Sequence, residues 1–256
     1  MPLTSRPSSK AATIAPGDGR PSALRRPVVC ASAGIGLVLL LILYTLMRTP
    51  GWYAPPLIAP EERQAVRNNL IDAEQAFTES LLNLDTPFIY HLYQHDVNRW
   101  IAMRREIYPL IDELAPPVLQ EPFVVFEKDR ITLAGRYQAA GVSMVLSCDI
   151  EARYDHDAIV LKARSVRCGS IRMPIGFGRL GLSHAIERPA GKTWPGSPRI
   201  SGDFVNGLRI DAQAWWKNGG VDYRVVSFEV KPGQIDFGIQ PLGRHASRQH
   251  SDQPDS

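Results

Sequence analysis

An uncharged run of 21 residues near the N-terminus, from Pro27 to Met47, limits what this chain can fold into more than any other feature. At about 1.5 Å per residue, a helix of this length spans the roughly 30 Å hydrocarbon core of a bilayer. The sequence Arg-Thr-Pro follows at residues 48–50, whereas a cleavable signal peptide has a shorter apolar stretch that ends in a small-residue cleavage site. We therefore predict a transmembrane helix at residues 27–47, with the lipid bilayer as its partner.

Basic residues precede this run and set its predicted orientation. Residues 1–48 carry six basic side chains and one acidic one, and only Arg48 of the basic set follows the run. Because basic loops resist translocation, we expect residues 1–26 in the cytoplasm and the following domain outside it, at the cell membrane. Residues 1–26 are also predicted to be a disordered tail, since they offer few large apolar side chains to bury.

The chain beyond the run is nearly neutral. Residues 49–240 carry 21 basic and 23 acidic side chains. A nucleic-acid-binding module places its basic excess on the folded domain, so we do not expect nucleic acid as a partner. The basic excess of the N-terminal segment is explained by membrane topology and by contact with anionic lipid.

Apolar spacing predicts two helices after a linker at residues 48–60. Between Glu61 and Leu84, apolar residues recur every three or four positions, which is one face of a helix. These residues are Val66, Leu70, Ala73, Phe77, Leu81 and Leu84. A short strand is predicted at residues 88–93. A second helix should then run from about His95 to Tyr108, with its polar face in water.

From Phe123 onward the apolar pattern has a period of two, which predicts about seven antiparallel strands. Two hairpins are expected at residues 123–137 and 144–163. A continuous strand at residues 208–216 should be the first strand of a three-stranded meander that ends near Ile239. Its turns are predicted at Asn218-Gly219 and Pro232-Gly233, with a bulge at Val225-Val226.

Together these elements predict an α+β fold with an N-terminal transmembrane helix, followed by amphipathic helices packed on a curved antiparallel sheet. The extracytoplasmic domain is expected to cover residues 61–240. Residues 241–256 are expected to be a disordered tail.

Several short motifs are typical of functional sites but lack the required context. Residues 176–181 read Gly-Phe-Gly-Arg-Leu-Gly, the spacing of a dinucleotide fingerprint, without a flanking parallel strand and helix. His91 and His95 lie four positions apart beside Asp96, but the first is predicted in a strand and the second at a helix start. The spacing of a helical metal site is therefore lost.

The remaining candidates are also better explained as structural residues. Cys148 and Cys168 should be buried free thiols, because hairpin register places Arg164 rather than Cys168 opposite Cys148. Ser183-His184 are neighbours in sequence rather than parts of a triad. The closest carboxylate pairs, Asp155 with Asp157 and Asp112 with Glu113, fall at a hairpin tip and a helix end. We predict no catalytic, cofactor-binding or metal-binding residue, no cofactor and no enzymatic activity.

Some of these segments resemble segments of known protein families. Residues 88–93, followed by Asp-Val-Asn-Arg-Trp-Ile at 96–101 and Gly-Ser-Ile-Arg-Met-Pro at 169–174, resemble the uncharacterised membrane-anchored YpmS-like proteins. Trp-Lys-Asn-Gly at 216–219 with Tyr-Arg-Val at 223–225 resembles planctomycete-type envelope proteins. This resemblance implies an extracytoplasmic domain without enzymatic activity and supplies no site residues.

Two hypotheses for function remain. The first is a single-pass, membrane-anchored domain that binds a lipid or a protein partner at the cell envelope. The alternative is an envelope hydrolase or a metal-dependent enzyme whose residues converge only in three dimensions. For the first hypothesis, the place where an apolar crevice for lipid would open is near Phe177, Trp194, Trp215 and Trp216. The alternative for these rings is that they fill the core.

Overall fold

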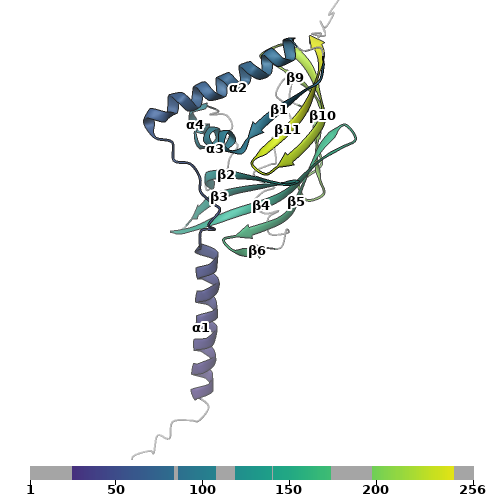
Figure 1. Ribbon diagram of the computed structural model, residues 1–256. Coiled ribbons are helices and arrows are strands. Elements are labelled where there is room, and N and C mark those ends of the chain that lie inside the picture. The colour runs from purple at the N-terminus through teal and green to yellow at the C-terminus, as the bar shows by residue number, and fades with distance from the viewer. Residues whose placement is uncertain (1–24, 84–85, 108–118, 140, 174–197, 245–256) are drawn as a thin grey trace, which may run out of the picture. The chain divides into compact units, whose positions relative to one another are not determined.

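The computed structural model describes residues 25–83, 86–107, 119–139, 141–173 and 198–244 (Figure 1). The chain divides into two compact units, Met1–Ile42 and Leu43–Ser256. Helix α1 (Arg25–Met47) contains the uncharged run and crosses this division. Within the part of the chain that the structure describes, no helix combines the length and hydropathy needed to cross a membrane.

The second unit is an α+β domain, as predicted, and its strands pair antiparallel. Its helices are η1 (Pro60–Glu62), α2 (Arg63–Asn83), α3 (Gln94–Ala102) and α4 (Arg104–Ile107). Its strands are β1 (Phe88–Tyr93), β2 (Leu119–Glu127), β3 (Arg130–Ala139), β4 (Val142–Asp155), β5 (Ala158–Cys168), β6 (Ile171–Met173), β7 (Ile200–Ser201), β8 (Leu208–Asp211), β9 (Gln213–Trp216), β10 (Val221–Lys231) and β11 (Gln234–Arg244).

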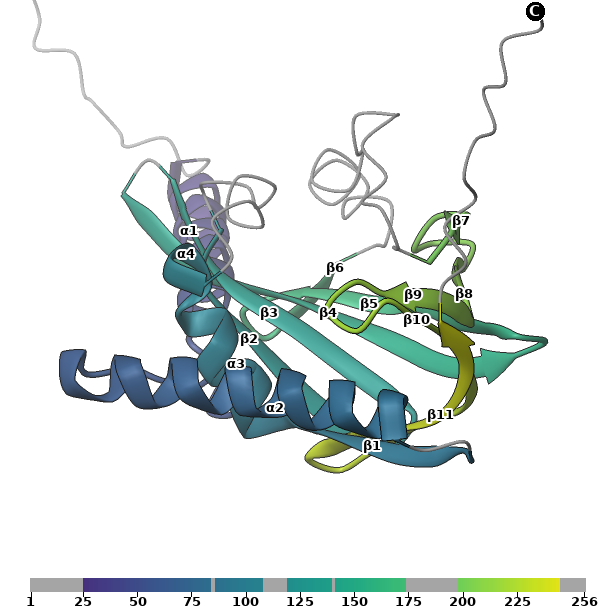
Figure 2. The same ribbon diagram turned by 90° about the horizontal axis from the view of Figure 1, so that it is seen from above.

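The strands form two sheets, so the prediction of a single curved sheet is wrong. One sheet has the order β1-β11-β10-β9, and the other has the order β2-β3-β4-β5-β8-β7, with β6 paired to β5. The two sheets form separate layers (Figures 1 and 2). Between them pack Val124 and Phe126 of β2, Ala152 of β4 and the hairpin residues Val230 and Ile235. The sequence pattern cannot distinguish this arrangement, because both sheets alternate with the same period.

The predicted strand at residues 208–216 shows where the chain changes sheet. It breaks at Ala212, so that β8 lies in the seven-stranded sheet and β9 in the four-stranded one. The Ala212 N–H donates to the Asp157 carbonyl at 2.8 Å, and its carbonyl accepts from the Val225 N–H at 2.8 Å. These bonds replace the ladder partners that a continuous strand would have used.

The other strand predictions are largely confirmed. The register of β10 against β11 shifts between Val225 and Ser227, where the bulge was expected. Gly233 has a φ of +79°, as the second central residue of a type II turn requires. Strand β11 continues to Arg244, so the ordered domain extends past the predicted end at residue 240.

Helix α2 covers the four-stranded sheet (Figure 2), and its apolar face is the predicted one. Val66, Leu70, Phe77 and Leu81 are all buried. The Phe77 ring lies against Phe88, Tyr90, Trp216 and Tyr223. Trp216 also donates its indole N–H to the Thr78 hydroxyl at 2.8 Å, so that ring belongs to the core.

Helix α3 docks on the edge of β2 through its polar side, which corrects the prediction that this side is in water. Asn98 is buried, donates from its amide to the Val124 carbonyl at 2.9 Å and accepts from the Val124 N–H at 2.8 Å. The Gln94 amide oxygen accepts from the Phe126 N–H at 2.6 Å. These bonds occupy the backbone edge of β2, which would otherwise be open to pairing with another chain.

Replacing Asn98 with alanine should lower the free energy of unfolding by about 2 to 3 kcal/mol. The substitution leaves the buried Val124 N–H and carbonyl without partners, and each unmet group carries a desolvation cost. Urea unfolding followed by circular dichroism measures the change. His95→Ala, one turn earlier at an exposed position, should change stability by less than about 0.5 kcal/mol. Equal stability of the two variants would refute the role assigned to Asn98.

Candidate functional site

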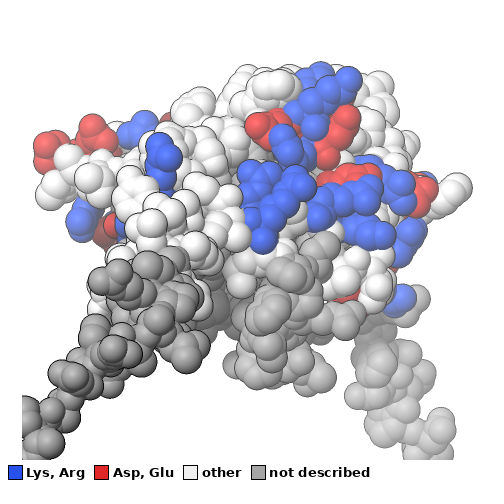
Figure 3. Space-filling model, turned by 90° about the horizontal axis from the view of Figure 1, so that it is seen from below, with Lys and Arg blue, Asp and Glu red and all other residues white. Residues whose placement is uncertain are grey.

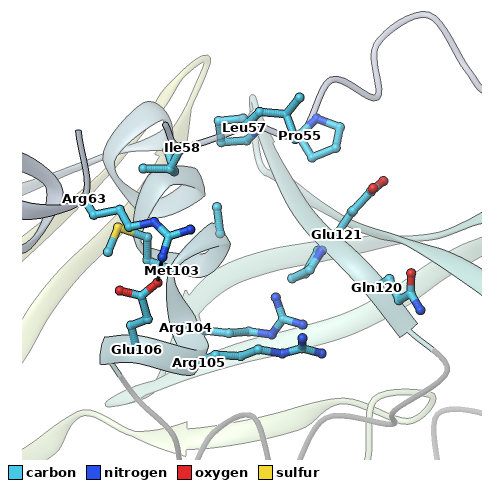
Figure 4. Close-up of a pocket in the computed structure, with 13 residues that line it drawn as sticks. Pro55, Leu57, Ile58, Arg63, Met103, Arg104, Arg105, Glu106, Gln120 and Glu121 are labelled. Atoms are coloured by element: carbon cyan, nitrogen blue, oxygen red, sulfur yellow. Dashed lines mark hydrogen bonds and ion pairs between the residues drawn. The ribbon is translucent and has the colours of Figure 1, made fainter. Parts of the chain in front are cut away.

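A pocket of about 400 Å³ lies where the linker after α1, the end of α3 with α4, and the start of β2 meet (Figure 4). This volume is within the range of natural small-molecule sites. Its lining residues are Pro55, Pro56, Leu57, Ile58, Arg63, Ala102, Met103, Arg104, Arg105, Glu106, Gln120, Glu121 and Pro122. All of them lie in the second unit.

The pocket has an apolar side and a polar side. Pro55, Leu57 and Ile58 of the linker lie on one side in Figure 4. Arg104 and Arg105 extend in the same direction from α4 toward Gln120 and Glu121 of β2. The Leu57 side chain is 90% exposed and is therefore accessible to a ligand. The site therefore offers both an apolar surface and guanidinium donors.

Tyr53 holds the linker against the domain and so positions the apolar wall. Its side chain is buried against Phe123, Ala134 and Val145. Its hydroxyl donates to the Glu121 carbonyl at 2.5 Å. Burial, and then the nearby Glu121 carboxylate, raise the pKa of Tyr53 to about 12, so the hydroxyl remains a donor at neutral pH.

The β2 wall of the pocket is a strained bulge. Glu121 has a φ of +47°, a left-handed conformation that is unfavourable for a residue with a Cβ. The register between β2 and β3 shifts between Gln120 and Phe123, and Pro122 cannot donate to the ladder. Two bonds stabilise the strained residue, one from Tyr53 and one from the Arg136 guanidinium to the Glu121 carboxylate at 2.7 Å. Gln120, Glu121 and Pro122 of this bulge line the pocket.

The described charged residues that line the pocket carry a small positive excess. Glu106 accepts from Arg63 at 2.8 Å and from Arg67 at 3.2 Å, which ties α4 to α2. Glu121 is paired with Arg136. The charged residues that line the pocket are thus three arginines, Arg63, Arg104 and Arg105, and two glutamates, which leaves one positive charge. Arginine binds phosphate and carboxylate groups through paired donors, so the polar side is suited to an anion.

The predicted histidine candidates lie away from this pocket. His91 is in strand β1 and His95 at the start of α3, as expected, and the Tyr93 ring lies between their rings. His91 Nδ1 is 2.7 Å from the Asp236 carboxylate, which also accepts from Lys231 at 2.7 Å. Among the described residues, no three histidines, cysteines or acids are grouped to hold a metal ion.

Cys148 and Cys168 are free and buried, as predicted. The register differs from the expected one, because Cys148 lies opposite Val166 and Cys168 opposite Leu146. Tyr154 pairs with Ile159, and β5 has an extra residue, Arg164, between the partners of Asp149 and Ile150. Burial raises the pKa of Cys148 to about 11, and burial also raises the pKa of Cys168.

The carboxylates Asp155 and Asp157 lie at the tip of the hairpin between β4 and β5, as predicted, with Asp155 at the end of β4 and Asp157 in the turn. The Tyr154 hydroxyl donates to Asp157 at 3.3 Å, and Arg209 lies 3.7 Å from Asp155. The other candidates lie outside the described residues: Asp112 with Glu113, residues 176–181, Ser183-His184, and Trp194.

None of the residues singled out in the sequence lines the pocket, and Trp215 and Trp216 belong to β9 instead. The available sequence signals were the Arg104-Arg105 pair near the end of the predicted helix and an apolar residue, Leu57, directly after two prolines. Neither pattern is distinctive without the tertiary structure, because charged pairs at helix ends and apolar residues beside proline are common. The pocket exists only because three segments distant in sequence meet. No family model, curated protein or solved structure matches this chain.

Proposed function

We propose that this chain is a single-pass, membrane-anchored protein whose extracytoplasmic domain binds an amphipathic anion of the phospholipid type in the linker pocket. The observation that carries the proposal is the pairing of an apolar wall at Pro55, Leu57 and Ile58 with Arg104 and Arg105 across the same pocket. Hydrocarbon would contact the apolar wall and a phosphate group would contact the arginines.

The sequence of α1 supports the anchor. Residues 27–47 are uncharged, and basic residues concentrate before them, which favours a cytoplasmic N-terminus and a domain at the cell envelope. Ten large apolar side chains between Ile35 and Met47 are at least 44% exposed. Apolar side chains all around a helix are favourable where lipid or protein covers them.

The position of the pocket in the chain supports a lipid ligand. Its apolar wall begins at Pro55, eight residues after the end of α1 at Met47. The wall is thus built by the segment that leaves the proposed anchor. A site built by residues that follow a membrane anchor so closely in the chain has ready access to lipid molecules at the membrane surface.

Short-chain phosphatidylglycerol, titrated below its micelle concentration into the purified full chain, tests the proposal by calorimetry. We expect binding that is weakened roughly tenfold by Arg104→Gln with Arg105→Gln, since a charge-assisted hydrogen bond contributes about 1.5 to 3 kcal/mol. Leu57→Asp should also weaken binding without loss of stability, because this side chain is 90% exposed. Phosphatidylcholine of the same chain length should bind more weakly.

The matched control is Arg224→Gln with Arg244→Gln, which removes two exposed arginines from the four-stranded sheet. This variant should bind phosphatidylglycerol as the parent chain does. Binding that is equal in all variants would show that the ligand contacts a different surface. An absence of binding in the parent chain would refute the lipid-binding proposal.

A further inference from the structure

The seven-stranded sheet has an outer face opposite the layer that contains α3 and the four-stranded sheet. Val124, Phe126 and Ala152 point to the layer between the sheets. Side chains alternate along a strand, so neighbours of these residues point outward, and directly paired residues share a face. The strand register therefore places three groups of side chains together on the outward side. Asp149 lies beside Thr132 and Ser165, and Glu151 lies beside Lys162. Arg153 and Arg209 lie on either side of Val160, with which both pair. We call this surface the outer face.

Basic side chains concentrate on the outer face, where Figure 3 shows lysine and arginine interrupted by a few acids. By register and contact its basic residues are Arg130, Arg153, Lys162, Arg164, Arg167, Arg172 and Arg209. Its acidic residues are Glu127, Asp149, Glu151, Asp155 and Asp211. The face thus has a basic excess, whereas residues 49–240 as a whole carry 21 basic and 23 acidic side chains. Positive charge is therefore segregated onto this face.

Three of the cations are available to an external partner. Arg153, Lys162 and Arg172 are exposed and form no ion pair with an acid in the described ranges. Asp149, by contrast, is buried and occupied by Arg167, Thr132 and Ser165. The acid at the centre of the face therefore contributes little repulsion toward an anionic surface.

The linker confines the outer face to the vicinity of the anchor. Tyr53 is buried on this face beside Phe123, Ala134 and Val145. Five residues separate it from Met47, the last residue of α1. A fully extended chain of this length reaches roughly 20 Å, whatever the direction of the helix. This limit follows from chain length alone.

We propose that the outer face rests on the anionic phospholipid headgroups of the membrane in which the chain is anchored. The inference rests on the proposed membrane anchoring and adds the surface that contacts the bilayer. Its occupant is identified by charge complementarity and by the short tether from Met47 to Tyr53. Each basic side chain near an anionic membrane surface contributes about 1 kcal/mol. The contact fixes which side of the domain faces lipid.

Acetylation of Lys162 in the full chain, reconstituted in lipid nanodiscs, tests this contact. We expect acetylation to be roughly fivefold slower in discs with phosphatidylglycerol than in discs of phosphatidylcholine alone. Lys217, in the loop between β9 and β10, is the internal reference and should react equally in both. At about 1 M salt, where the Debye length falls to about 3 Å, the protection of Lys162 should disappear.

A double variant tests the charge directly and keeps Lys162 as the probe. Arg153→Gln with Arg172→Gln should remove the protection, whereas the matched pair Arg224→Gln with Arg244→Gln should retain it. Equal acetylation of Lys162 in both lipids overturns the proposal. Protection in both lipids that resists salt also overturns it, since another part of the chain or a protein then covers the face. A chain that fails to incorporate into discs refutes the anchor itself, so the two failures are distinguishable.

Discussion

Phe77→Ala should lower the free energy of unfolding by about 4 kcal/mol, the largest effect that we expect from a single substitution in this domain. The Phe77 ring has four aromatic neighbours, with centroid distances of 4.9 Å to Tyr90, 4.9 Å to Trp216, 5.7 Å to Tyr223 and 6.1 Å to Phe88. With Leu81, it packs α2 against the four-stranded sheet. Its removal leaves a cavity and cancels four edge-to-face contacts.

Two companion variants separate the ring from general effects on the helix. Phe77→Leu keeps most of the volume and should cost about 1.5 kcal/mol. Leu82→Ala removes an apolar side chain that is 50% exposed on the same helix and should cost less than about 0.5 kcal/mol. Chemical unfolding of the purified chain gives all three values. If Phe77→Ala costs no more than Leu82→Ala, α2 is not held by this cluster.

Asp149→Ala should cost about 3 kcal/mol at neutral pH. Asp149 accepts from Thr132 at 2.9 Å, Ser165 at 2.6 Å and Arg167 at 2.8 Å, and these bonds join β3, β4 and β5. Hydrogen bonds to a charged group contribute about 1.5 to 3 kcal/mol, and the buried hydroxyls lose their acceptor. Asp211→Asn, at an exposed position in β8 of the same sheet, should be within about 0.5 kcal/mol of the parent chain.

The contribution of Asp149 to the free energy of unfolding should depend on pH. Burial alone would raise the pKa of Asp149, but the hydrogen bonds from Ser165 and Thr132 and the charge of Arg167 outweigh it and hold this pKa below its usual value. A carboxyl group whose pKa is lower in the folded state contributes its full stabilisation of the fold at pH values above its unfolded-state pKa of about 3.9. This stabilisation is lost as the pH falls through the pKa of the group in the folded state. The stability difference between the parent chain and Asp149→Asn should therefore be constant near pH 7 and shrink below about pH 4. A difference that is unchanged at pH 2 would contradict this assignment.

The local elements were predictable from the sequence because local rules govern them. Helix α2 follows from the spacing of Val66, Leu70, Phe77 and Leu81, and its apolar face is buried as predicted. The Pro232-Gly233 turn and the bulge near Val226 follow from backbone preferences of a few adjacent residues. The Asn218-Gly219 turn is only partly right. Trp216 pairs with Val221 around a four-residue loop, and the positive φ falls on Gly220.

The assignment of strands to sheets needed the tertiary structure. Alternation with a period of two marks one buried face per strand but carries no information about which sheet that face belongs to. The same limit explains Asn98. A polar residue on a helix is normally expected in water, and only the position of the β2 edge shows that its amide satisfies backbone groups.

The sequence by itself determined the α+β class, helix α2, most hairpins and the charge distribution along the chain, because each depends on residues close together. Only the tertiary structure decided the two-sheet arrangement, the pocket beside Arg104 and Arg105, and the basic outer face. The physical reason is that a site depends on which distant segments meet. Long-range packing brings the linker at Pro55, the end of α3 and the strained Glu121 together, and no local pattern encodes that contact.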